Sequence, residues 1–384
     1  MIIAQESLDS KSSIKDLTGP SPLVAANLVL VFGSVKRFNE GKLQSTLKGR
    51  YPSAQIVGCT TSGEISPDGV FDDSIQITAI QWQKVIQRVA QSQASSMQDS
   101  FETAVNLANQ LKAETLRTVL VISDGLNVNG SELVNGFQSV LGDTPIIGGL
   151  AGDGGAFVKT LQLFNETISD HMVIAVGLYG DALVTSSGAL GGWRPYGPPR
   201  KVTRSEKNVV YELDGKPALP LYQMYIGAAF SKGLPGSGLK FPLAIIEEGK
   251  REVEKIRTLL AIDPSENSLT FAGNVDEGEV IRLCQTNHDR LVEGAGAAAN
   301  LVLDGLGDHN TNQTGLALCV SCVGRKGVMA EDVVDEVKLV QQILGAQTSV
   351  TGFYSYGEIA PRPKTTDSVL HNQTMTIGYL SETL

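Results

Sequence analysis

Gly58-Cys-Thr-Thr-Ser-Gly-Glu-Ile65 and Gly352-Phe-Tyr-Ser-Tyr-Gly-Glu-Ile359 share the pattern G-x4-G-E-I, although they lie near opposite ends of the chain. Each copy follows a short run of apolar or β-branched residues. A glycine at each end of the pattern indicates a tight turn that needs a positive φ or a close backbone approach. The glutamate after the turn is therefore held in place rather than merely solvated. The repetition predicts either two pseudo-equivalent modules or two halves of one site.

Apolar runs and helical patterns alternate around these turns. Leu28–Phe32 and Arg117–Asp124 contain continuous apolar runs, which are typical of strands buried on both faces. Ser74–Trp82 alternates apolar and polar residues, as a half-buried strand does. Ser100–Lys112 and Ser131–Leu141 carry apolar residues at helical spacing. The alternation predicts an α/β fold of two mixed domains with layered sheets and helices.

The glycine- and proline-rich segment Gly191–Pro199 interrupts this alternation and is the predicted hinge. We therefore expect an N-terminal arm at residues 1–23, a first α/β domain at residues 24–205 and a second at residues 206–384. The arm is polar and contains Pro20 and Pro22, so we expect a lead-in helix or a loose segment there.

The composition narrows the class of protein. Hydrophobic residues make up 42% of the chain and charged residues 19%, as in folded globular proteins. The net charge of −10 argues against nucleic acid and against anionic membranes as partners, because both attract basic clusters. No segment approaches the about 20 apolar residues that cross a bilayer, and the N-terminus lacks a signal-peptide pattern. Four cysteines do not form a disulfide framework in a chain of 384 residues, so we expect a cytoplasmic protein.

Two motifs with the spacing of functional sites have simpler structural explanations. Cys319-Val-Ser-Cys322 lies in an apolar run, and in a strand its two Cα atoms would be about 10 Å apart, beyond the reach of a disulfide. No second pair completes a zinc site, so we expect buried structural thiols and no metal. Gly294-Ala-Gly-Ala-Ala-Ala299 fits close helix packing better than a dinucleotide turn, because no strand precedes it directly.

A third glycine-rich segment, Gly148–Gly155, follows a predicted strand. It is either a loop that presents backbone N–H groups to a ligand or a plain hairpin connection. Four histidines are present, and none belongs to a paired metal motif. One axial histidine suffices to bind haem iron, which makes His171 and His371 the candidates for a haem site. The alternative for both is an ordinary polar role.

Catalysis has candidate groups in this chain but no signature. Glu64 and Glu358 form a carboxylate pair for acid–base chemistry only if the two domains face each other. Cys59 is a further candidate nucleophile. The sequence contains no nucleophile elbow, Walker A or kinase pattern. We therefore expect a binding protein rather than an enzyme.

Several ordered motifs resemble the FIST sensory domain family, from about residue 24 to the end of the chain. The matching segments are Gly58–Ile65, Gly148–Gly154, Asp170–Gly180, Tyr211–Ala218, Ser321–Arg325, Gly352–Pro361 and Leu370–Thr374. The resemblance implies a ligand-sensing module of bacterial and archaeal signal transduction, with amino acids or other metabolites as ligands. Some stand-alone members are haem proteins that sense nitric oxide and regulate a histidine kinase.

The chain ends after its last predicted strand, so the resemblance implies a stand-alone sensor. Such a sensor signals through a separate protein, such as a histidine kinase or a cyclic-di-nucleotide enzyme. No cofactor is expected unless the protein is one of the haem-binding members. The leading prediction is thus a sensor of a small molecule; the alternatives are a haem-based nitric-oxide sensor and an enzyme.

The predicted ligand-binding residues combine directed polar groups with aromatic walls, as ligand pockets do. They are Glu64, Gly149, Asp153, Arg325, Tyr354, Tyr356, Glu358 and His371. Arg325 is expected to bind a ligand carboxylate through two parallel hydrogen bonds, or equally to pair with Glu358 as a structural ion pair.

Overall fold

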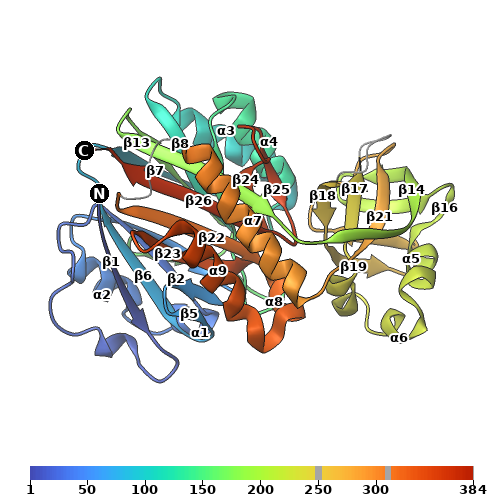
Figure 1. Ribbon diagram of the computed structural model, residues 1–384, viewed down its shortest axis with the longest axis horizontal. Helices are drawn as coiled ribbons and strands as arrows, with labels where there is room; N and C mark the ends of the chain where they lie inside the picture. The colour runs from blue at the N-terminus through green and yellow to red at the C-terminus, as the bar shows by residue number, and fades with distance from the viewer. Residues whose placement is uncertain (247–252, 308–312, 384) are drawn as a thin grey trace.

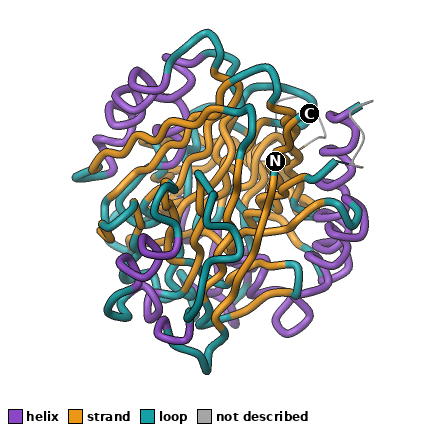
Figure 2. The backbone as a smooth tube through the Cα atoms, turned by 90° about the vertical axis from the view of Figure 1, so that its left-hand side faces the viewer, coloured by secondary structure: helices purple, strands orange, loops and turns teal. Residues whose placement is uncertain are grey.

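The computed structural model describes residues 1–246, 253–307 and 313–383. Figure 1 shows a large body on the left and a small lobe on the right, and the lobe contains residues 194–246 and 253–285. In Figure 2 the strands fill the interior of the body and the helices lie around them. Among the described residues, no helix combines the length and the apolar character needed to traverse a lipid bilayer.

The body consists of three copies of one six-stranded unit, which we call repeats. The first repeat comprises β1 (Ile2–Leu8), β2 (Leu28–Gly33), β3 (Gln55–Thr60), β4 (Glu64–Ser66), β5 (Gly69–Phe71) and β6 (Ile75–Gln81). The second comprises β7 (Ile86–Gln93), β8 (Leu116–Ser123), β9 (Ile146–Leu150), β10 (Gln162–Phe164), β11 (Thr167–Ser169) and β12 (Met172–Tyr179). The third comprises β13 (Leu183–Leu190), β22 (Gly315–Cys322), β23 (Thr348–Ser355), β24 (Gly357–Pro361), β25 (Ser368–His371) and β26 (Met375–Glu382).

Each repeat keeps four strands in its own sheet and gives its hairpin to another. The first sheet runs β1-β6-β2-β3, and the others follow the same order as β7-β12-β8-β9 and β13-β26-β22-β23. Hairpin β4–β5 pairs with β23 of the third repeat, hairpin β10–β11 with β3 of the first, and hairpin β24–β25 with β9 of the second. The exchange is therefore cyclic, and each of the three sheets of the body has six strands.

A glycine in the third strand of each repeat permits this close parallel pairing. The paired residues are Val31–Gly58, Val121–Gly148 and Cys319–Gly352. A Cβ atom at any of the three glycines would collide with the carbonyl oxygen of its partner. Gly148 and Gly352 also have positive φ angles of 130° and 155°. The first glycine of the G-x4-G-E-I pattern is thus fixed by strand packing, and it occurs three times rather than twice.

Helices cover the outer faces of the sheets, and the inner faces share one core. The helices are α1 (Val35–Phe38) and α2 (Leu43–Arg50) in the first repeat, α3 (Ser100–Leu111) and α4 (Gly130–Leu141) in the second, and α7 (His288–Leu306), α8 (Val323–Met329) and α9 (Val334–Leu344) in the third. The shared core contains Phe32, Ile122 and Phe353, one from each repeat. The rings of Phe32 and Phe353 lie 4.7 Å apart.

The small lobe is inserted between β13 and α7, and it has its own core around Tyr222 and Phe271. Its sheet runs β18-β17-β21-β14-β15-β20-β19, with β16 beside β15. Its elements are β14 (Arg194–Glu206), β15 (Val209–Leu213), β16 (Lys216–Pro217), α5 (Ala218–Ile226), α6 (Ala228–Ser231), β17 (Leu243–Ile246), β18 (Val253–Arg257), β19 (Leu259–Asp263), β20 (Ser268–Phe271) and β21 (Val280–Gln285). The predicted hinge Gly191–Pro199 covers the passage from the body into β14 (Figure 1).

The predicted α/β class with layered sheets and helices is confirmed, but two local predictions are wrong. The start of the predicted arm is neither loose nor helical, because Ile2–Leu8 form β1, which pairs with β6 along its whole length. Strand β6 is not half-buried, because it lies between β1 and β2 with both faces covered. The sheets also combine strands from either side of residue 205, so the predicted division at that residue separates segments of sequence that share sheets.

The two structural interpretations of the small-residue and cysteine motifs are confirmed. Cys319 and Cys322 are buried free thiols in β22. In α7, a Cβ atom at Gly294 would clash with the backbone of Gly191 and Gly192. The glycine therefore lets the helix pack directly against the chain where it leaves the body for the small lobe.

Candidate functional site

Turns from all three repeats meet at one end of the body. They follow β3, β9 and β23, and they include both G-E-I turns and the start of the glycine-rich segment. Backbone hydrogen bonds join Ser62 N to Tyr354 O, Gly152 N to Thr60 O, and Tyr356 N to Leu150 O. The structure therefore brings together the three segments that the sequence analysis singled out.

The carboxylate of Glu64 fastens its own turn to the start of β6. Thr61 Oγ1 donates a hydrogen bond to one carboxylate oxygen. The N–H and the hydroxyl of Ser74 donate to the other, at 3.1 Å and 2.7 Å. Burial raises the pKa of Glu64 to about 7.

Glu358 repeats this arrangement at the start of β26. Ser355 Oγ donates to one oxygen at 2.9 Å, and the N–H and hydroxyl of Thr374 donate to the other at 3.1 Å and 2.8 Å. Burial again raises the pKa to about 7. Each of the two carboxylates accepts its hydrogen bonds from nearby residues of the protein itself. Glu64 and Glu358 therefore connect their turns to the following strands in this arrangement.

Gln162 occupies the same position in the second repeat. It stands opposite Cys59 in the ladder, just as Glu64 stands opposite Phe353 and Glu358 opposite Gly149. Its Oε1 accepts the N–H of Met172 at 3.0 Å. A neutral amide therefore accepts the equivalent backbone N–H in place of a carboxylate, and the second repeat lacks the G-E-I pattern for this reason.

The second repeat also has an extra segment between β9 and β10, and Asp153 shapes it. The Asp153 carboxylate accepts the N–H groups of Phe157, Val158 and Lys159 at 2.7–2.8 Å, and Tyr356 donates its hydroxyl to it. Burial raises the pKa of Asp153, but these hydrogen bonds lower it by more, so the pKa lies below its usual value. The rings of Phe157 and Tyr356 are stacked, with centres 4.3 Å apart.

This stacked pair lines a cleft of about 200 Å³ between the body and the small lobe. The body contributes Met97, Gly125, Leu126, Val128, Asn129, Leu150, Phe157 and Tyr356, and the lobe contributes Asn208, Leu260, Phe271, Ala272 and Gly273. Beside the cleft, Asn274 of the lobe bonds to the side chains of Asn129, Ser131 and Glu132. The lining is predominantly apolar, as small-molecule pockets are.

Neither Phe157 nor any residue that the lobe contributes to the cleft is among the predicted ligand-binding residues. Phe157 and Val158 are 39% and 79% exposed. Two consecutive large apolar residues directly after a glycine-rich stretch are a signal that could have identified this wall. The lobe residues carry no comparable pattern in the sequence.

Arg325 pairs with Glu336 rather than with Glu358, and it lines none of the cavities described here. It is fully buried and forms an ion pair with Glu336. It also donates to the carbonyl oxygens of Gly191, at 2.6 Å, and Leu291, at 2.9 Å. The predicted pair with Glu358 is not formed, because α8 directs the guanidinium toward the base of the small lobe rather than toward the turns.

Tyr354 and Gly149 are also buried away from the cleft. The hydroxyl of Tyr354 donates to Glu336, so the ring belongs to the Arg325 network rather than to a ligand wall. Gly149 lies in β9 directly opposite Glu358, where a Cβ atom would press on the backbone of Gly357. Neither residue therefore lines the cleft, and both hold elements of the body together.

His171 and His371 do not form a haem site in this arrangement. The imidazole of His371 is buried in hairpin β24–β25, with Nε2 3.1 Å from the carbonyl oxygen of Ala360. Burial lowers its pKa to about 4. His171 lies in the tight connection between β11 and β12, with a positive φ of 58°. Neither histidine lines any of the cavities described here, so the residues present do not fit a haem.

Glu64 and Asp153 do share the wall of a second cavity, of about 370 Å³, with Asp72 and Lys326. The ammonium group of Lys326 donates to the carbonyl oxygen of Ser62 at 2.9 Å and also bonds to Asp72. The charged groups here are thus paired with their own chain. Among the described residues, no group of three or more His, Cys, Asp or Glu side chains is arranged to hold a metal ion.

Comparison with known families agrees with the motifs that meet at this end of the body. The model of the FIST N domain matches residues 27–216, and that of the FIST C domain matches residues 218–361. The chain belongs to the FIST family. FIST domains are associated with sensory signal transduction and with ligand binding. The boundary between the two FIST domains falls at β16, inside the small lobe.

Uncharacterized proteins of several organisms are similar to this chain. An uncharacterized protein of Methanocaldococcus jannaschii is 25% identical over 335 residues, which cover 79% of this chain and 61% of that protein. An uncharacterized protein of Mycobacterium bovis is 26% identical over 253 residues, covering 63% of this chain and 62% of its own length. The chain thus spans about three fifths of these relatives. A cyanuric acid hydrolase from A. caulinodans aligns along 100% of this chain and 99% of its own, with 9% identity and a TM-score of 0.40.

Proposed function

We propose that this FIST protein is a cytoplasmic sensor that binds an amino acid or a similar small metabolite in the cleft between body and small lobe. The observation that carries this proposal is that both parts of the molecule contribute walls to one predominantly apolar cleft. A volume of about 200 Å³ suits a small ligand. The four buried free cysteines fit a reducing compartment.

The position of the cleft supports a signalling role. A ligand that contacts Phe157 on one side and Phe271 on the other stabilises one arrangement of the lobe relative to the body, because its affinity depends on both walls. Two connecting segments join the lobe to the body. Thr286 in one of them donates its hydroxyl to the carbonyl oxygen of Gly192 in the other, at 3.0 Å. A shift in the lobe is then presented to a separate partner, such as a kinase or a cyclic-di-nucleotide enzyme.

A binding role has more support than catalysis. Glu64 and Glu358 are saturated by hydrogen bonds from their own turns. Cys59 is fully buried, and burial raises the pKa of its thiol, which disfavours the reactive thiolate. None of the three is a free group facing the cleft between body and lobe.

Replacing Phe157 with alanine is expected to weaken ligand binding about tenfold. The substitution removes one ring of the stacked wall, and such aromatic contacts are worth about 1 kcal/mol beyond the area they bury. The measurement is calorimetric titration with aromatic and aliphatic amino acids, after a thermal-shift screen of both classes. Val158→Ala is the matched control, since Val158 is adjacent and exposed but does not line the cleft. Equal affinities for both variants would exclude this cleft as the ligand site.

A further inference from the structure

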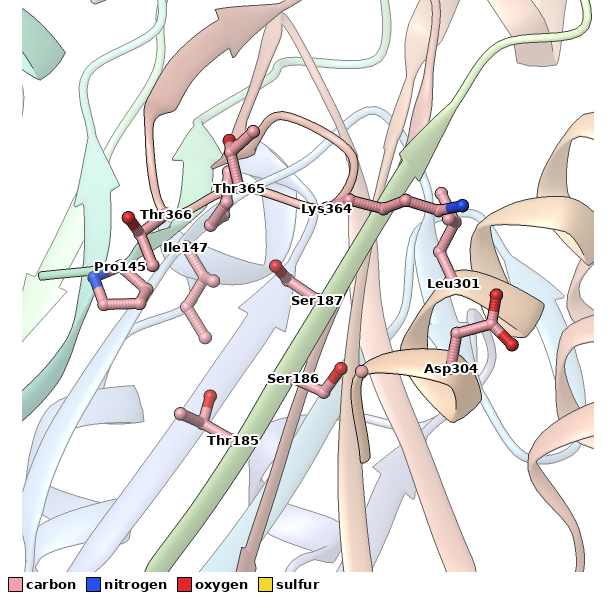
Figure 3. Close-up of a pocket in the computed structure, with 12 residues that line it drawn as sticks. Pro145, Ile147, Thr185, Ser186, Ser187, Leu301, Asp304, Lys364, Thr365 and Thr366 are labelled. Atoms are coloured by element: carbon pink, nitrogen blue, oxygen red, sulfur yellow. The ribbon is translucent and has the colours of Figure 1, made fainter. Parts of the chain in front are cut away.

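A third cavity, of about 740 Å³, is larger than the two described above and lies on another side of the body. We call it the seam cavity, because it opens where the sheet of the third repeat meets the sheet of the second. Figure 3 shows it between β13, the start of β9, helix α7 and the turn that joins β24 to β25. It shares no lining residue with the cleft between body and lobe.

The pseudo-symmetry of the body explains why a cavity exists at this seam. In the first repeat, Gln5 of β1 stands opposite Thr78 of β6. Its Nε2 donates to Thr78 Oγ1 at 3.2 Å and to Val350 O at 2.9 Å. The Gln5 side chain thereby fills the space between the first sheet and the third.

The corresponding positions of the third repeat are Ser187 and Gly378, which face each other across β13 and β26. Ser74 and Thr374 donate hydrogen bonds to the two equivalent glutamates, Glu64 and Glu358. Thr78 lies four residues after Ser74, and Gly378 lies four residues after Thr374, so the two positions correspond. Ser187 is too short to cross the seam, and Gly378 lacks a side chain and lies against Ile147. The seam that Gln5 fills in the first repeat is left open here.

The second repeat closes its seam by a different route. Val89 of β7 stands opposite Val176 of β12 at the equivalent position. It is partly buried and packs against the shared core of the body. The third repeat is therefore the one whose equivalent residue, Ser187, has neither a long amide side chain like Gln5 nor an apolar side chain like Val89 to fill the seam.

The walls of the seam cavity are rich in hydroxyl groups. Thr185, Ser187 and Thr366 line it, and their hydroxyls have no hydrogen-bond partner among the described residues. In Figure 3 the hydroxyl-bearing side chains of β13 and of the β24–β25 turn surround the opening, with Ile147 between them. Such a wall can exchange hydrogen bonds with several groups of a polar ligand.

One positive and one negative side chain stand at the rim. Lys364 extends from the β24–β25 turn toward α7, and the carboxylate of Asp304 projects from α7 on the same side (Figure 3). Within the described part of the chain, neither forms an ion pair. The ammonium group favours one anionic group on a ligand, and the carboxylate accepts hydrogen bonds from hydroxyls.

We propose that the seam cavity binds a polyhydroxylated ligand with one anionic group, of the class of sugar acids and sugar phosphates. Lys364 pairs with the anionic group, while Thr185, Ser187, Thr366 and Asp304 bond to the hydroxyls. The cavity volume is within the range of small-molecule sites. This site is separate from the cleft between body and lobe, and the proposal does not depend on ligand binding in that cleft.

The test is calorimetric titration of the full chain with D-gluconate, glucose 6-phosphate, glucose and inorganic phosphate. We expect D-gluconate or glucose 6-phosphate to bind more tightly than both glucose and inorganic phosphate, and the tighter of the two identifies the acid or phosphate class. Equal binding of inorganic phosphate and glucose 6-phosphate would overturn the proposal, since the site would then recognise an anion alone. So would the absence of binding by all four probes.

Ser187→Gln is the decisive variant, because it places in the third repeat the residue that fills the same position in the first. It is expected to fold and to weaken binding of the preferred probe at least tenfold. Lys364 is exposed, and Lys364→Ala is expected to weaken binding of the anionic probe and to leave the affinity for glucose unchanged. Phe157→Ala is the control, since it alters the other cleft and should leave this binding intact. Unchanged affinity in Ser187→Gln would locate the ligand elsewhere and overturn the proposal.

Discussion

Replacing Arg325 with alanine is expected to lower the free energy of unfolding by about 3–5 kcal/mol, because it leaves the buried charge of Glu336 without its partner. The guanidinium also bonds to the carbonyl oxygens of Gly191 and Leu291, which then lose a buried donor. These two carbonyls belong to the two chain segments that connect the small lobe. The substitution is therefore expected to loosen the lobe as well as the body.

Urea unfolding followed by fluorescence measures this loss. Lys36→Ala is the matched control, since the Lys36–Asp73 pair is exposed and such pairs contribute about 1 kcal/mol or less. The double variant Arg325→Met with Glu336→Leu removes both charges together, and we expect it to unfold at higher urea than Arg325→Ala. A single variant as stable as Lys36→Ala would show that the buried network contributes little.

The stability of the protein is expected to fall as pH rises through 7, because of Glu64 and Glu358. Burial raises the pKa of each from 4.5 to about 7. A raised pKa means that the folded state favours the protonated carboxyl, so the stabilisation is fully present below pH 4.5 and is lost as pH rises through 7. At about 1.4 kcal/mol per pH unit, the loss is at most about 3 kcal/mol for each carboxyl.

The double variant Glu64→Gln, Glu358→Gln is expected to remove this dependence. The second repeat already carries Gln162 at the equivalent position, so the amide fits the turn. The variant should resemble the parent at pH 4.5 and require more urea to unfold at pH 8. Gln162→Glu is the reverse test, and it should add pH dependence of the same sign. Parallel urea midpoints for parent and double variant across this range would contradict the assignment.

Local patterns in the sequence predicted the parts of the fold that depend on neighbouring residues. Continuous apolar runs such as Leu28–Phe32 correspond to buried strands because both faces of the sheets are covered. The glycine of each G-x4-G-E-I copy was correctly associated with close backbone approach. The pairing of distant strands could not be predicted, because β4 of the first repeat pairs with β23 and nothing local specifies that partner.

The second repeat does not show the G-E-I pattern, because its sequence differs from the other two at one residue and contains one extra segment. Gln162 replaces glutamate, and the segment that holds Asp153 and Phe157 separates it from Gly148. All three repeats contain a strand, a helix and a glycine-bearing strand in succession, whereas only the first and the third contain G-E-I.

The candidate site was predicted in part, for a similar reason. Asp153 and Tyr356 do meet, since their segments follow strands that end at the same edge of the body. Glu336 was not considered as the partner of Arg325, because the direction of a side chain at the start of α8 depends on how the lobe connection packs. The lobe half of the cleft depends on the docking of two separate cores, which no local pattern records.

The cyclic exchange of hairpins makes the body an interlocked ring of three links. Each repeat contributes two strands to a neighbouring sheet and receives two strands in its own. Removing any one repeat would therefore expose the edge of a second sheet and leave the hairpin of the remaining repeat without a strand to pair with. The amino group of Met1 lies 2.9 Å from Glu382, so the ring also closes where the chain begins and ends. The smallest autonomous unit is consequently the entire ring, and no sheet is finished until residues from distant parts of the chain have met.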